Sequence, residues 1–311
     1  MMTPRTDWIA LNSQVPCDVP QETVLCLGNF DGVHMGHRAL LHAARKLCRE
    51  RFPHASCGVF CFPEPSTDYL LPVPPRHLCT LPQKMERFFD NGMDVLCLSD
   101  FATLRNLSPD EFIDFLCSGC HAVALVCGFN YHFGKNGSGT AEHLSRRLPG
   151  RVLTVPEVLW KQETVSSTRI RACIADGNLE DANAMLTLPY SFSAPVLHGK
   201  ALGRKLGSPT VNQFFPEQMQ VPRHGVYVTE CVIADGTRYR GVTNVGVRPT
   251  VDSDQTLNCE TFLLDFSGNL YGQELEVSFL KWLRPEQKFA SETLLREQIQ
   301  KDIRSAAEAV F

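Results

Sequence analysis

The densest concentration of reactive side chains lies between Gly28 and His37. The segment reads Gly28-Asn29-Phe30-Asp31-Gly32-Val33-His34-Met35-Gly36-His37. An apolar run predicts a strand at 23–27 before it, and a helix is expected from Arg38 to about Arg51 after it. A glycine-bearing turn between a strand and a helix aims the N–H groups of the helix start at a phosphate. His34 and His37 lie three residues apart, on one face of the first helical turn, where two imidazoles stabilise charge developing on a phosphoryl group.

Histidines in isolation are more often ordinary surface residues, and a pair is sometimes half of a metal site. Here Gly28, Asp31, Gly32 and Gly36 share the same short segment, which favours phosphate chemistry. No third ligand with metal-site spacing stands nearby, which weakens a zinc interpretation.

Two further segments have the composition of ligand-binding loops. Ser166-Ser167-Thr168-Arg169-Ile170-Arg171 opens a predicted helix with hydroxyls and guanidinium groups, which suit a polyphosphate, although an N-cap is the simpler alternative. The glycine-rich loop 128–139 follows a fully apolar strand at 122–127. Open α/β sheets bind ligands at the carboxyl ends of such strands, but several glycines in a loop are by themselves a weak signal.

A second concentration of chemistry spans 198–212. Three glycines and three cations alternate there, an arrangement that can wrap a polyphosphate: Gly199, Lys200, Gly203, Arg204, Lys205 and Gly207. Thr210 and Asn212 would lie on one side of an extended chain and offer the oxygen ligands that Mg²⁺ prefers. A flexible surface loop is the alternative.

The surrounding pattern predicts the elements that position these residues. Apolar strands at 57–62, 94–98 and 122–127 alternate with helices at 81–91 and 108–117, which favours a parallel, doubly wound sheet. From about Tyr190, short β-rich runs and tight turns predict a small antiparallel barrel, closed by a terminal helix from about Ser291. We expect a domain boundary near residue 186, giving domains 1–186 and 187–311.

Length, composition and charge limit the number of domains, the class of protein and its partners. The 311 residues suffice for about two domains, and 43% apolar and 21% charged residues are ordinary for a globular protein. A net charge of −4 provides no basic footprint, so we expect no nucleic-acid partner. No signal peptide or 18-residue apolar run is present, so we expect no membrane partner. The 13 scattered cysteines are interpreted as reduced thiols, which favours the cytoplasm.

The segment from Gly28 to His37 resembles the signature of the HxGH nucleotidyltransferases, specifically the FMN adenylyltransferase module of bacterial FAD synthetases. Pro209-Thr210-Val211-Asn212 resembles the motif of the riboflavin kinase module at the C-terminal end of those proteins. Further matching pieces follow in family order: Gly225-Val226-Tyr227, Asn244-Val245-Gly246, Arg248-Pro249-Thr250, Glu260-Thr261 and Leu263-Leu264-Asp265-Phe266. The resemblance runs from about residue 20 to 303.

This resemblance implies an α/β protein with an N-terminal Rossmann-like nucleotidyltransferase sheet and a C-terminal β-barrel. It implies the substrates ATP, riboflavin and FMN, with Mg²⁺ accompanying ATP, in a monomer or weak homo-oligomer. Catalysis would fall to His34, His37 and Glu260, the last as the base facing the ribityl 5′-hydroxyl, and metal binding to Thr210 and Asn212. Flavin binding would fall to Asn130, His132, Gly134 and Arg248. The nucleotide-binding residues would be Gly28, Asn29, Phe30, Asp31, Gly36, Ser166, Ser167, Thr168, Arg171, Gly199, Lys200, Gly203, Lys205 and Gly207.

Ser208 and Val211 stand in the kinase motif where the family has an aromatic residue and an alanine, and three positions of the adenylyltransferase module also depart from the family pattern. Asn130 and His132 stand where the family usually has Asp and Arg, and Glu64 introduces a negative charge after the second strand. One alternative is therefore a riboflavin kinase with a weakened or inactive adenylyltransferase module. Another is a flavin-nucleotide sensor without turnover, against which Glu260 argues, because binding alone needs no base.

Overall fold

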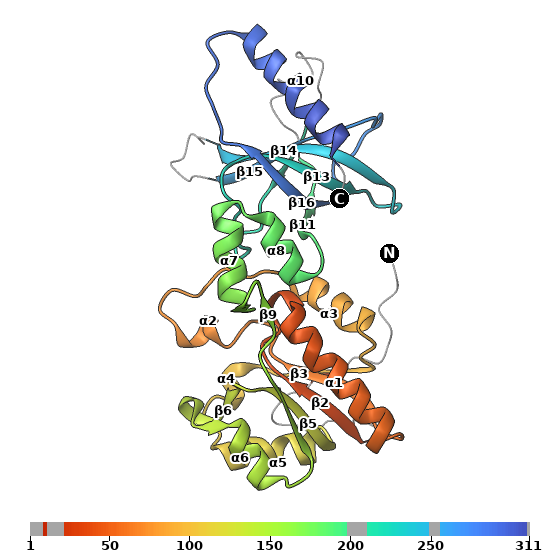
Figure 1. The fold of residues 1–311 in the computed structure, drawn as a ribbon, viewed down its shortest axis with the longest axis vertical. Helices are drawn as coiled ribbons and strands as arrows, with labels where there is room; N and C mark the ends of the chain where they lie inside the picture. The colour runs from red at the N-terminus through yellow and green to blue at the C-terminus, as the bar shows by residue number, and fades with distance from the viewer. Residues whose placement is uncertain (1–8, 11–21, 198–209, 249–255, 310–311) are drawn as a thin grey trace. The chain divides into compact units, whose positions relative to one another are not determined.

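The structure, a computed structural model, describes residues 9–10, 22–197, 210–248 and 256–309. The chain divides into two compact units (Figure 1). The N-terminal unit comprises Met2–Pro75 and Thr80–Ser167, and the C-terminal unit comprises Thr168–Phe311 together with Arg76–Cys79.

A six-stranded parallel sheet forms the N-terminal unit, in the order β1-β4-β3-β2-β5-β8. Its strands are β1 (Ile9–Ala10), β2 (Thr23–Leu27), β3 (Ser56–Cys61), β4 (Val95–Leu98), β5 (Ala122–Gly128) and β8 (Val152–Val155). The chain runs from β2 to β3 and β4 on one side and only later to β5 and β8 on the other. The strand order therefore reverses beside β2, and such a switch point is where open α/β sheets bind ligands.

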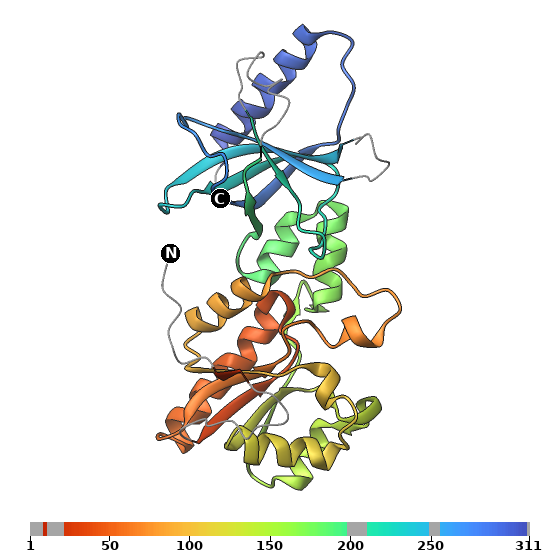
Figure 2. The same cartoon turned by 180° about the vertical axis from the view of Figure 1, so that it is seen from behind.

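Helices cover both faces of this sheet (Figures 1 and 2). On one face α1 (Met35–Arg51) and α3 (Leu81–Asp90) bury Leu41 and Phe88 against Val24 of β2. On the other, α4 (Phe101–Leu104), α5 (Pro109–Gly119) and α6 (Ala141–Arg147) pack against Leu25. Neighbouring residues of β2 thus enter different cores, which explains why the strand is apolar throughout.

Short elements complete the N-terminal unit. They are helix α2 (Thr67–Leu70), the β6–β7 hairpin (His132–Phe133 with Gly139–Thr140) and the β9–β10 hairpin (Leu159–Trp160 with Glu163–Thr164). Helix α5 begins with a capping box, in which Ser108 and Glu111 exchange side-chain and backbone hydrogen bonds.

An antiparallel sheet forms the C-terminal unit, in the order β11-β16-β13-β14-β15-β12. The strands are β11 (Tyr190–Pro195), β12 (Thr210–Phe214), β13 (Gly225–Val232), β14 (Arg238–Arg248), β15 (Thr256–Leu263) and β16 (Glu274–Arg284). The two edges meet where Leu197 N–H donates to the Asn212 carbonyl at 2.7 Å. The buried Gln213 amide also donates to the Ala194 and Leu275 carbonyls, each at 2.7 Å, so the sheet curls into a small barrel.

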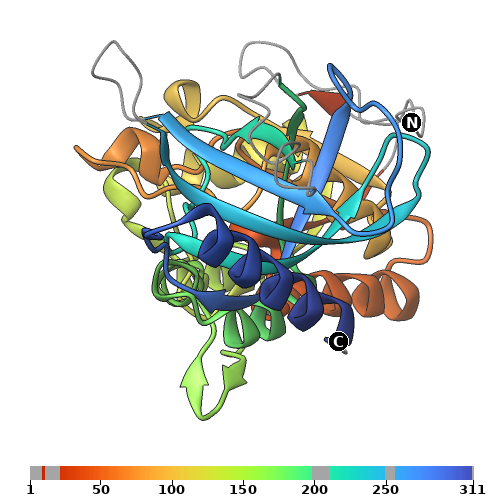
Figure 3. The same ribbon diagram turned by 90° about the horizontal axis from the view of Figure 1, so that it is seen from above.

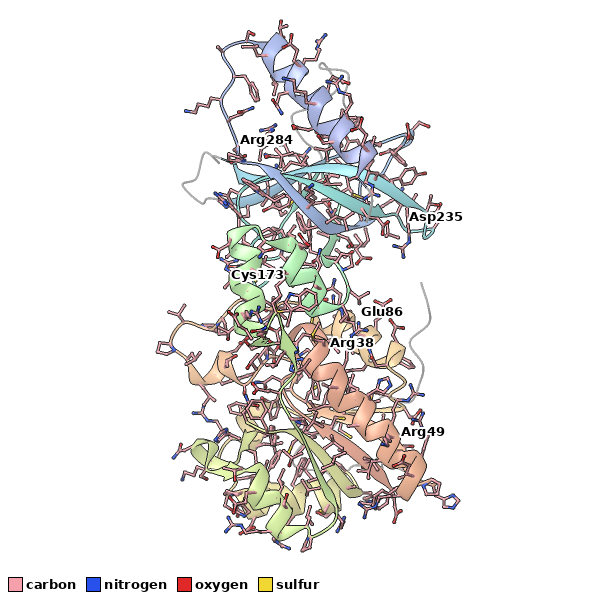
Figure 4. All side chains as sticks on the ribbon, in the orientation of Figure 1. Arg38, Arg49, Glu86, Cys173, Asp235 and Arg284 are labelled. Atoms are coloured by element: carbon pink, nitrogen blue, oxygen red, sulfur yellow. The ribbon has the colours of Figure 1, made fainter. Side chains whose placement is uncertain are left out.

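In the described residues, three helices accompany the barrel: α7 (Ser167–Asp176), α8 (Leu179–Leu186) and α10 (Glu292–Glu308). Helix α10 lies across the barrel strands and contacts β13 and β14 (Figure 3). Arg284, at the end of β16 (Figure 4), donates to both carboxylate oxygens of Asp302 on α10, at 2.7–3.1 Å. Both side chains are largely buried, and such a forked pair fixes the position of the helix on the barrel.

The predicted fold class is confirmed: a parallel sheet with helices on both faces, then a curled antiparallel sheet with a terminal helix. The strand pattern missed β1, β8 and β12, as well as the two short hairpins. β1 and β8 are only two and four residues long, and β12 carries the polar residues Thr210, Asn212 and Gln213. None of the described helices is both long and apolar enough to cross a bilayer.

Candidate active sites

The turn after β2 contains strained backbone. Phe30, Gly32 and Val33 have positive φ angles of 52°, 80° and 44° around the short 3₁₀ segment η1 (Asp31–Val33). Such angles cost non-glycine residues on the order of 1–3 kcal/mol each, so the surroundings must hold them in place. The buried Phe30 ring contributes by packing edge-on against Phe88 of α3, with ring centroids 5.3 Å apart.

His34 and His37 form a stacked pair at the start of α1. Their ring centroids are 3.7 Å apart and their planes differ by 14°. His34 precedes the helix as its N-cap, where Nδ1 accepts from the His37 N–H at 3.3 Å. Neutral His34 therefore carries its proton on Nε2, an assignment that follows from the hydrogen bond. A side chain at Gly36 would meet the His34 ring at 3.1 Å, so the glycine makes room for the pair.

His37 is held neutral. Burial lowers its pKa well below the ordinary value, and neighbouring His34 and the Lys84 cation lower it further. Its Nδ1 is buried without a hydrogen-bond partner among the described residues. His37 therefore offers neutral ring nitrogens rather than a fixed positive charge.

Two buried cations of α3 stabilise the strained turn by donating hydrogen bonds to its carbonyl groups. Lys84 Nζ donates to the Asn29 carbonyl at 3.2 Å, and an Arg87 guanidinium nitrogen donates to the Gly32 carbonyl at 2.9 Å. Lys84 is only 2% exposed and Arg87 6%. Ser167 Oγ holds the same turn through the Asp31 carbonyl at 3.0 Å. The turn is thus fixed through three of its carbonyl groups.

A cavity of about 690 Å³ opens at the carboxyl edge of the parallel sheet. Of the residues singled out in the sequence, it is lined by Gly28, Asn29, His34, Gly36, His37, Asn130, His132, Gly134, Ser166 and Ser167. The volume is that of a site for a nucleotide-sized molecule. The segments after β2, β5 and β8, far apart in the chain, thus contribute to one cavity.

The side of the cavity after β3 and β4 is aromatic and apolar. It is lined by Phe60, Phe62, Leu70, Phe101, Leu104 and Phe112. Arg105, beside Leu104, is the one arginine or lysine among the lining residues, and Glu157 is the one carboxylate. Among the described residues no hydrogen bond or ion pair engages the Arg105 side chain. It is therefore available to a ligand.

In the C-terminal unit, strand register brings together Asn212 and Glu260. They are directly opposite each other on β12 and β15, and Asn244 of β14 is opposite Glu260 on the other side. Residues in register share one face of a sheet. This face is the outer one, because the neighbours Gln213, Thr243 and Thr261 are fully buried inside the barrel.

Asn258 and Glu286 extend this polar cluster. The Asn258 amide donates to Asn212 Oδ1 at 3.3 Å and to Glu260 Oε1 at 3.1 Å. Asn244 donates to Glu286 Oε1 at 2.9 Å. Gly246 lies directly under this carboxylate, since a Cβ there would come within 2.2 Å of Glu286 Oε1. Two carboxylates and three amides thus meet on one patch of the barrel surface.

Two family models match the chain: FAD synthetase over residues 17–169 and riboflavin kinase over residues 186–310. The bifunctional riboflavin kinase/FMN adenylyltransferase of Listeria monocytogenes is 34% identical over 283 residues, 90% of each chain. The protein of the same description from Pseudomonas fluorescens is 37% identical over 288 residues, 91% of each chain. The chain belongs to the bifunctional riboflavin kinase/FMN adenylyltransferase family.

A solved structure agrees over nearly the same length. The crystal structure of a macrolide-efflux protein from Streptococcus pneumoniae is similar with a TM-score of 0.88 and 31% identity, covering 98% of this chain and 100% of that one.

Several positions that the family resemblance assigned to a ligand have other contacts in this chain. Phe30 and Asp31 are buried in or under the turn and do not line the cavity. Arg171 Nε donates to the Arg76 carbonyl at 2.6 Å within the C-terminal unit, where Thr168 also lies. Glu64, expected near the nucleotide, does not line the cavity and accepts from the Tyr69 hydroxyl at 3.3 Å. The Glu64 carboxylate thus makes a local hydrogen bond outside the cavity.

Some predicted residues lie outside the described residues: Gly199, Lys200, Gly203, Lys205 and Gly207. Arg248 is described as the last residue of β14, by its backbone alone. Thr210 begins β12, two residues before Asn212, as the extended spacing predicts.

Sequence reasoning missed Lys84, Arg87, Arg105 and Asn258. Lys84 and Arg87 gave one usable signal: two cations three residues apart on the buried side of an amphipathic helix, beside Phe88. Arg105 and Asn258 gave none, because each acquires its neighbours only through the arrangement of strands.

Proposed function

We propose that this chain is a bifunctional enzyme of flavin cofactor synthesis. The C-terminal unit transfers the γ-phosphoryl group of ATP to riboflavin and gives FMN. The N-terminal unit joins FMN to the AMP part of another ATP and releases pyrophosphate, giving FAD. The observation that carries this proposal is the match of both family models, supported by the stacked His34 and His37 in the N-terminal cavity.

In the adenylyl transfer, a phosphate oxygen of FMN attacks the α-phosphorus of ATP, and the bond to pyrophosphate breaks. Charge builds on the oxygens of that phosphorus, so catalysis consists of positioning and of donors aimed at those oxygens. His34 offers Nε2–H, because its Nδ1 is occupied as the helix cap. The N–H groups of the first turn of α1, with Ser166 on the opposite lining, suit the polyphosphate. The aromatic side of the cavity suits the isoalloxazine ring.

In the kinase step, the ribityl 5′-oxygen attacks the γ-phosphorus and ADP leaves. Glu260 takes the hydroxyl proton, a role that contributes on the order of 10²–10⁴-fold. Its position supports this, because its side chain is exposed on the outer face of the barrel and fixed at one oxygen by Asn258. The second carboxylate oxygen is left for the hydroxyl.

Phosphoryl and adenylyl transfer from ATP generally needs a divalent metal ion, and we propose Mg²⁺. The donor set fits it: Asn212 Oδ1 and the Thr210 hydroxyl are hard oxygens, and Asn258 Oδ1 is buried without a partner in the described part of the chain. The described residues contain no group of three His, Cys, Asp or Glu side chains arranged for a metal. Phosphate oxygens and water would therefore complete the coordination, as Mg²⁺ prefers, and the bound ion would neutralise charge on the transferred group.

We place the enzyme in a reducing compartment, the cytoplasm, as a monomer or weak homo-oligomer. The cysteines of the described residues are all free, and most are buried. Even Cys117 and Cys120, three residues apart at the end of α5, form no disulfide. Free thiols at this density are typical of proteins that stay reduced.

The test is incubation of the purified chain with riboflavin, ATP and Mg²⁺, followed by chromatography, with a parallel reaction started from FMN. We expect FAD in both. FMN as the final product in the first reaction, with no FAD in the second, would assign the chain to a riboflavin kinase with an inactive adenylyltransferase module. If neither riboflavin nor FMN is converted, the proposed enzyme function is wrong and the alternative of a flavin-nucleotide sensor without turnover is favoured.

A further inference from the structure

Asn258 lies at the centre of the polar cluster in the C-terminal unit. It precedes Glu260 by two residues on β15 and so projects from the same face of the strand. It is opposite Phe214 on β12 and Gly246 on β14. Although the face is the outer one, Asn258 is only 6% exposed and Asn212 only 7%. A buried amide on such a face needs a reason, because amides are usually left in water.

The orientation of the Asn258 amide is determined by its neighbours. Its nitrogen lies 3.3 Å from Asn212 Oδ1 and 3.1 Å from Glu260 Oε1, and both of these atoms are acceptors. If the amide were flipped, Asn258 Oδ1 would face Asn212 Oδ1 and Glu260 Oε1, and three acceptor oxygens would lie together without a hydrogen between them. The two hydrogens of one NH₂ group therefore serve two different side chains, one from β12 and one from β15.

We propose that Asn258 is a positioning residue of the riboflavin kinase site, an inference that rests on the function proposed above. Its amide sets the spacing and orientation of the proposed metal ligand Asn212 relative to the proposed base Glu260. Each partner keeps a free position: Asn212 Oδ1 retains a lone pair for the ion, and Glu260 retains its second oxygen for the 5′-hydroxyl. A shift of these groups by an ångström can cost about 10²-fold in rate.

A second observation points the same way. Asn258 Oδ1 is buried and has no hydrogen-bond partner among the residues that the structure describes. An unpaired buried acceptor costs on the order of 1–3 kcal/mol, so such atoms are rare outside sites that receive a ligand. An O–H donor that arrives with the substrates, a metal-bound water or a ribityl hydroxyl, satisfies this oxygen. The site is therefore complete only in the loaded enzyme.

The test compares three substitutions in the full chain: Asn258→Asp, Asn258→Ser and Asn258→Ala. Asp has the shape of Asn but lacks both N–H donors and faces two oxygens. Ser keeps one donor, and Ala keeps none. The matched control is Asn269→Asp, an exposed residue of the same unit whose Oδ1 accepts from the Tyr271 N–H at 3.0 Å, a bond that Asp retains.

We expect Asn258→Asp and Asn258→Ala to lower kcat for riboflavin phosphorylation about 10–100-fold with little change in KM for riboflavin. Asn258→Ser should retain about tenfold more activity than Ala. FAD formation from supplied FMN should stay at the level of the control, and calorimetry should show weaker binding of ADP with Mg²⁺ to Asn258→Ala.

Two results would overturn the inference. Asn258→Asp with kinase activity within about twofold of the control would mean that shape alone matters. If Asp unfolds the barrel, equal activities of the Ser and Ala variants would exclude a donor role. Failure of the proposed function is distinct, because the unsubstituted chain would then make no FMN.

Discussion

The two candidate sites serve similar chemistry, the transfer of a phosphate-containing group, but they are built differently. In the N-terminal unit the key groups come from one decapeptide, Gly28 to His37, held in strained backbone by Lys84 and Arg87 from behind. In the C-terminal unit the groups come from separate strands, and register alone makes neighbours of Asn212, Glu260 and Asn244. A local turn carries its own geometry, whereas a barrel surface depends on every strand being in place.

The electrostatics of the two sites differ as well. The N-terminal site uses a stacked histidine pair in which burial keeps His37 neutral, and Arg105 is the single arginine or lysine among its described lining residues. The C-terminal cluster carries two carboxylates, Glu260 and Glu286, linked through amides. The first arrangement suits stabilisation of phosphate charge, and the second suits proton removal beside a cation.

The sharpest test of the comparison is Glu260→Gln, for which we expect the largest effect. Gln keeps the size and one oxygen but cannot take the 5′-hydroxyl proton, so riboflavin phosphorylation should fall by roughly 10²–10⁴-fold. FAD formation from FMN should be unchanged on the same preparation. Riboflavin binding, followed by fluorescence, is the control, and near-normal kinase turnover with intact binding would make Glu260 a structural residue.

The reciprocal change is His34→Ala or His37→Ala. Loss of a preorganised donor to a developing charge costs about 10²–10³-fold, so FAD formation should collapse while riboflavin phosphorylation continues. Product chromatography separates the two rates. Survival of FAD synthesis in both variants would contradict the role assigned to the turn.

Arg105→Ala should have a smaller effect, confined to substrate binding. A charge-assisted hydrogen bond at an exposed position is worth about 1.4 kcal/mol, so KM in the adenylyl transfer should rise about tenfold with kcat nearly unchanged. Arg49→Ala, at the far end of α1, is the matched control on the same unit. An equal KM for the Arg105→Ala and Arg49→Ala variants would show that Arg105 does not contribute to substrate binding.

Two C-terminal fragments test whether each site is independent. We propose that a fragment starting at 187 phosphorylates riboflavin unaided, and a fragment starting at 168 retains α8 in addition. Asn183 of α8 donates to the Phe279 carbonyl at 2.9 Å and accepts from the Tyr190 N–H at 2.8 Å. We expect the longer fragment to be more stable by about 1–3 kcal/mol in urea unfolding. A folded shorter fragment that binds neither riboflavin nor ATP would contradict the boundary at 186.

The smallest expected effect is on stability at acidic pH. Because the pKa of His37 is lowered in the folded chain, the unfolded chain binds a proton more readily below about pH 6.5. Folding stability is therefore intact above that pH and decreases as the pH falls, by at most about 1.4 kcal/mol per pH unit for one proton. Urea unfolding followed from pH 7.5 to 5 should show a shallower slope for His37→Gln, and an equal slope would exclude this histidine as the cause.

The sequence determined the fold class and the local parts of both sites. Periodicity revealed β2, β3, β4 and β5, since strands buried on two faces must be apolar throughout. The capping box at Ser108 and the turn from Gly28 to His37 were legible because their contacts are local: the His34 side chain needs only the N–H of His37. The spacing of Thr210 and Asn212 puts both on one side of an extended chain, and the structure supplies that extended chain as β12.

Only the tertiary structure decided what depends on distant residues. The neutral state of His37 depends on burial under α3 and on Lys84, 47 positions along the chain. The availability of Arg105 and the contact of Asn258 with both Asn212 and Glu260 depend on strand order and register, which no single segment encodes. Burial and electrostatic interactions act through space, so residues that tune a site give no signal in its motif.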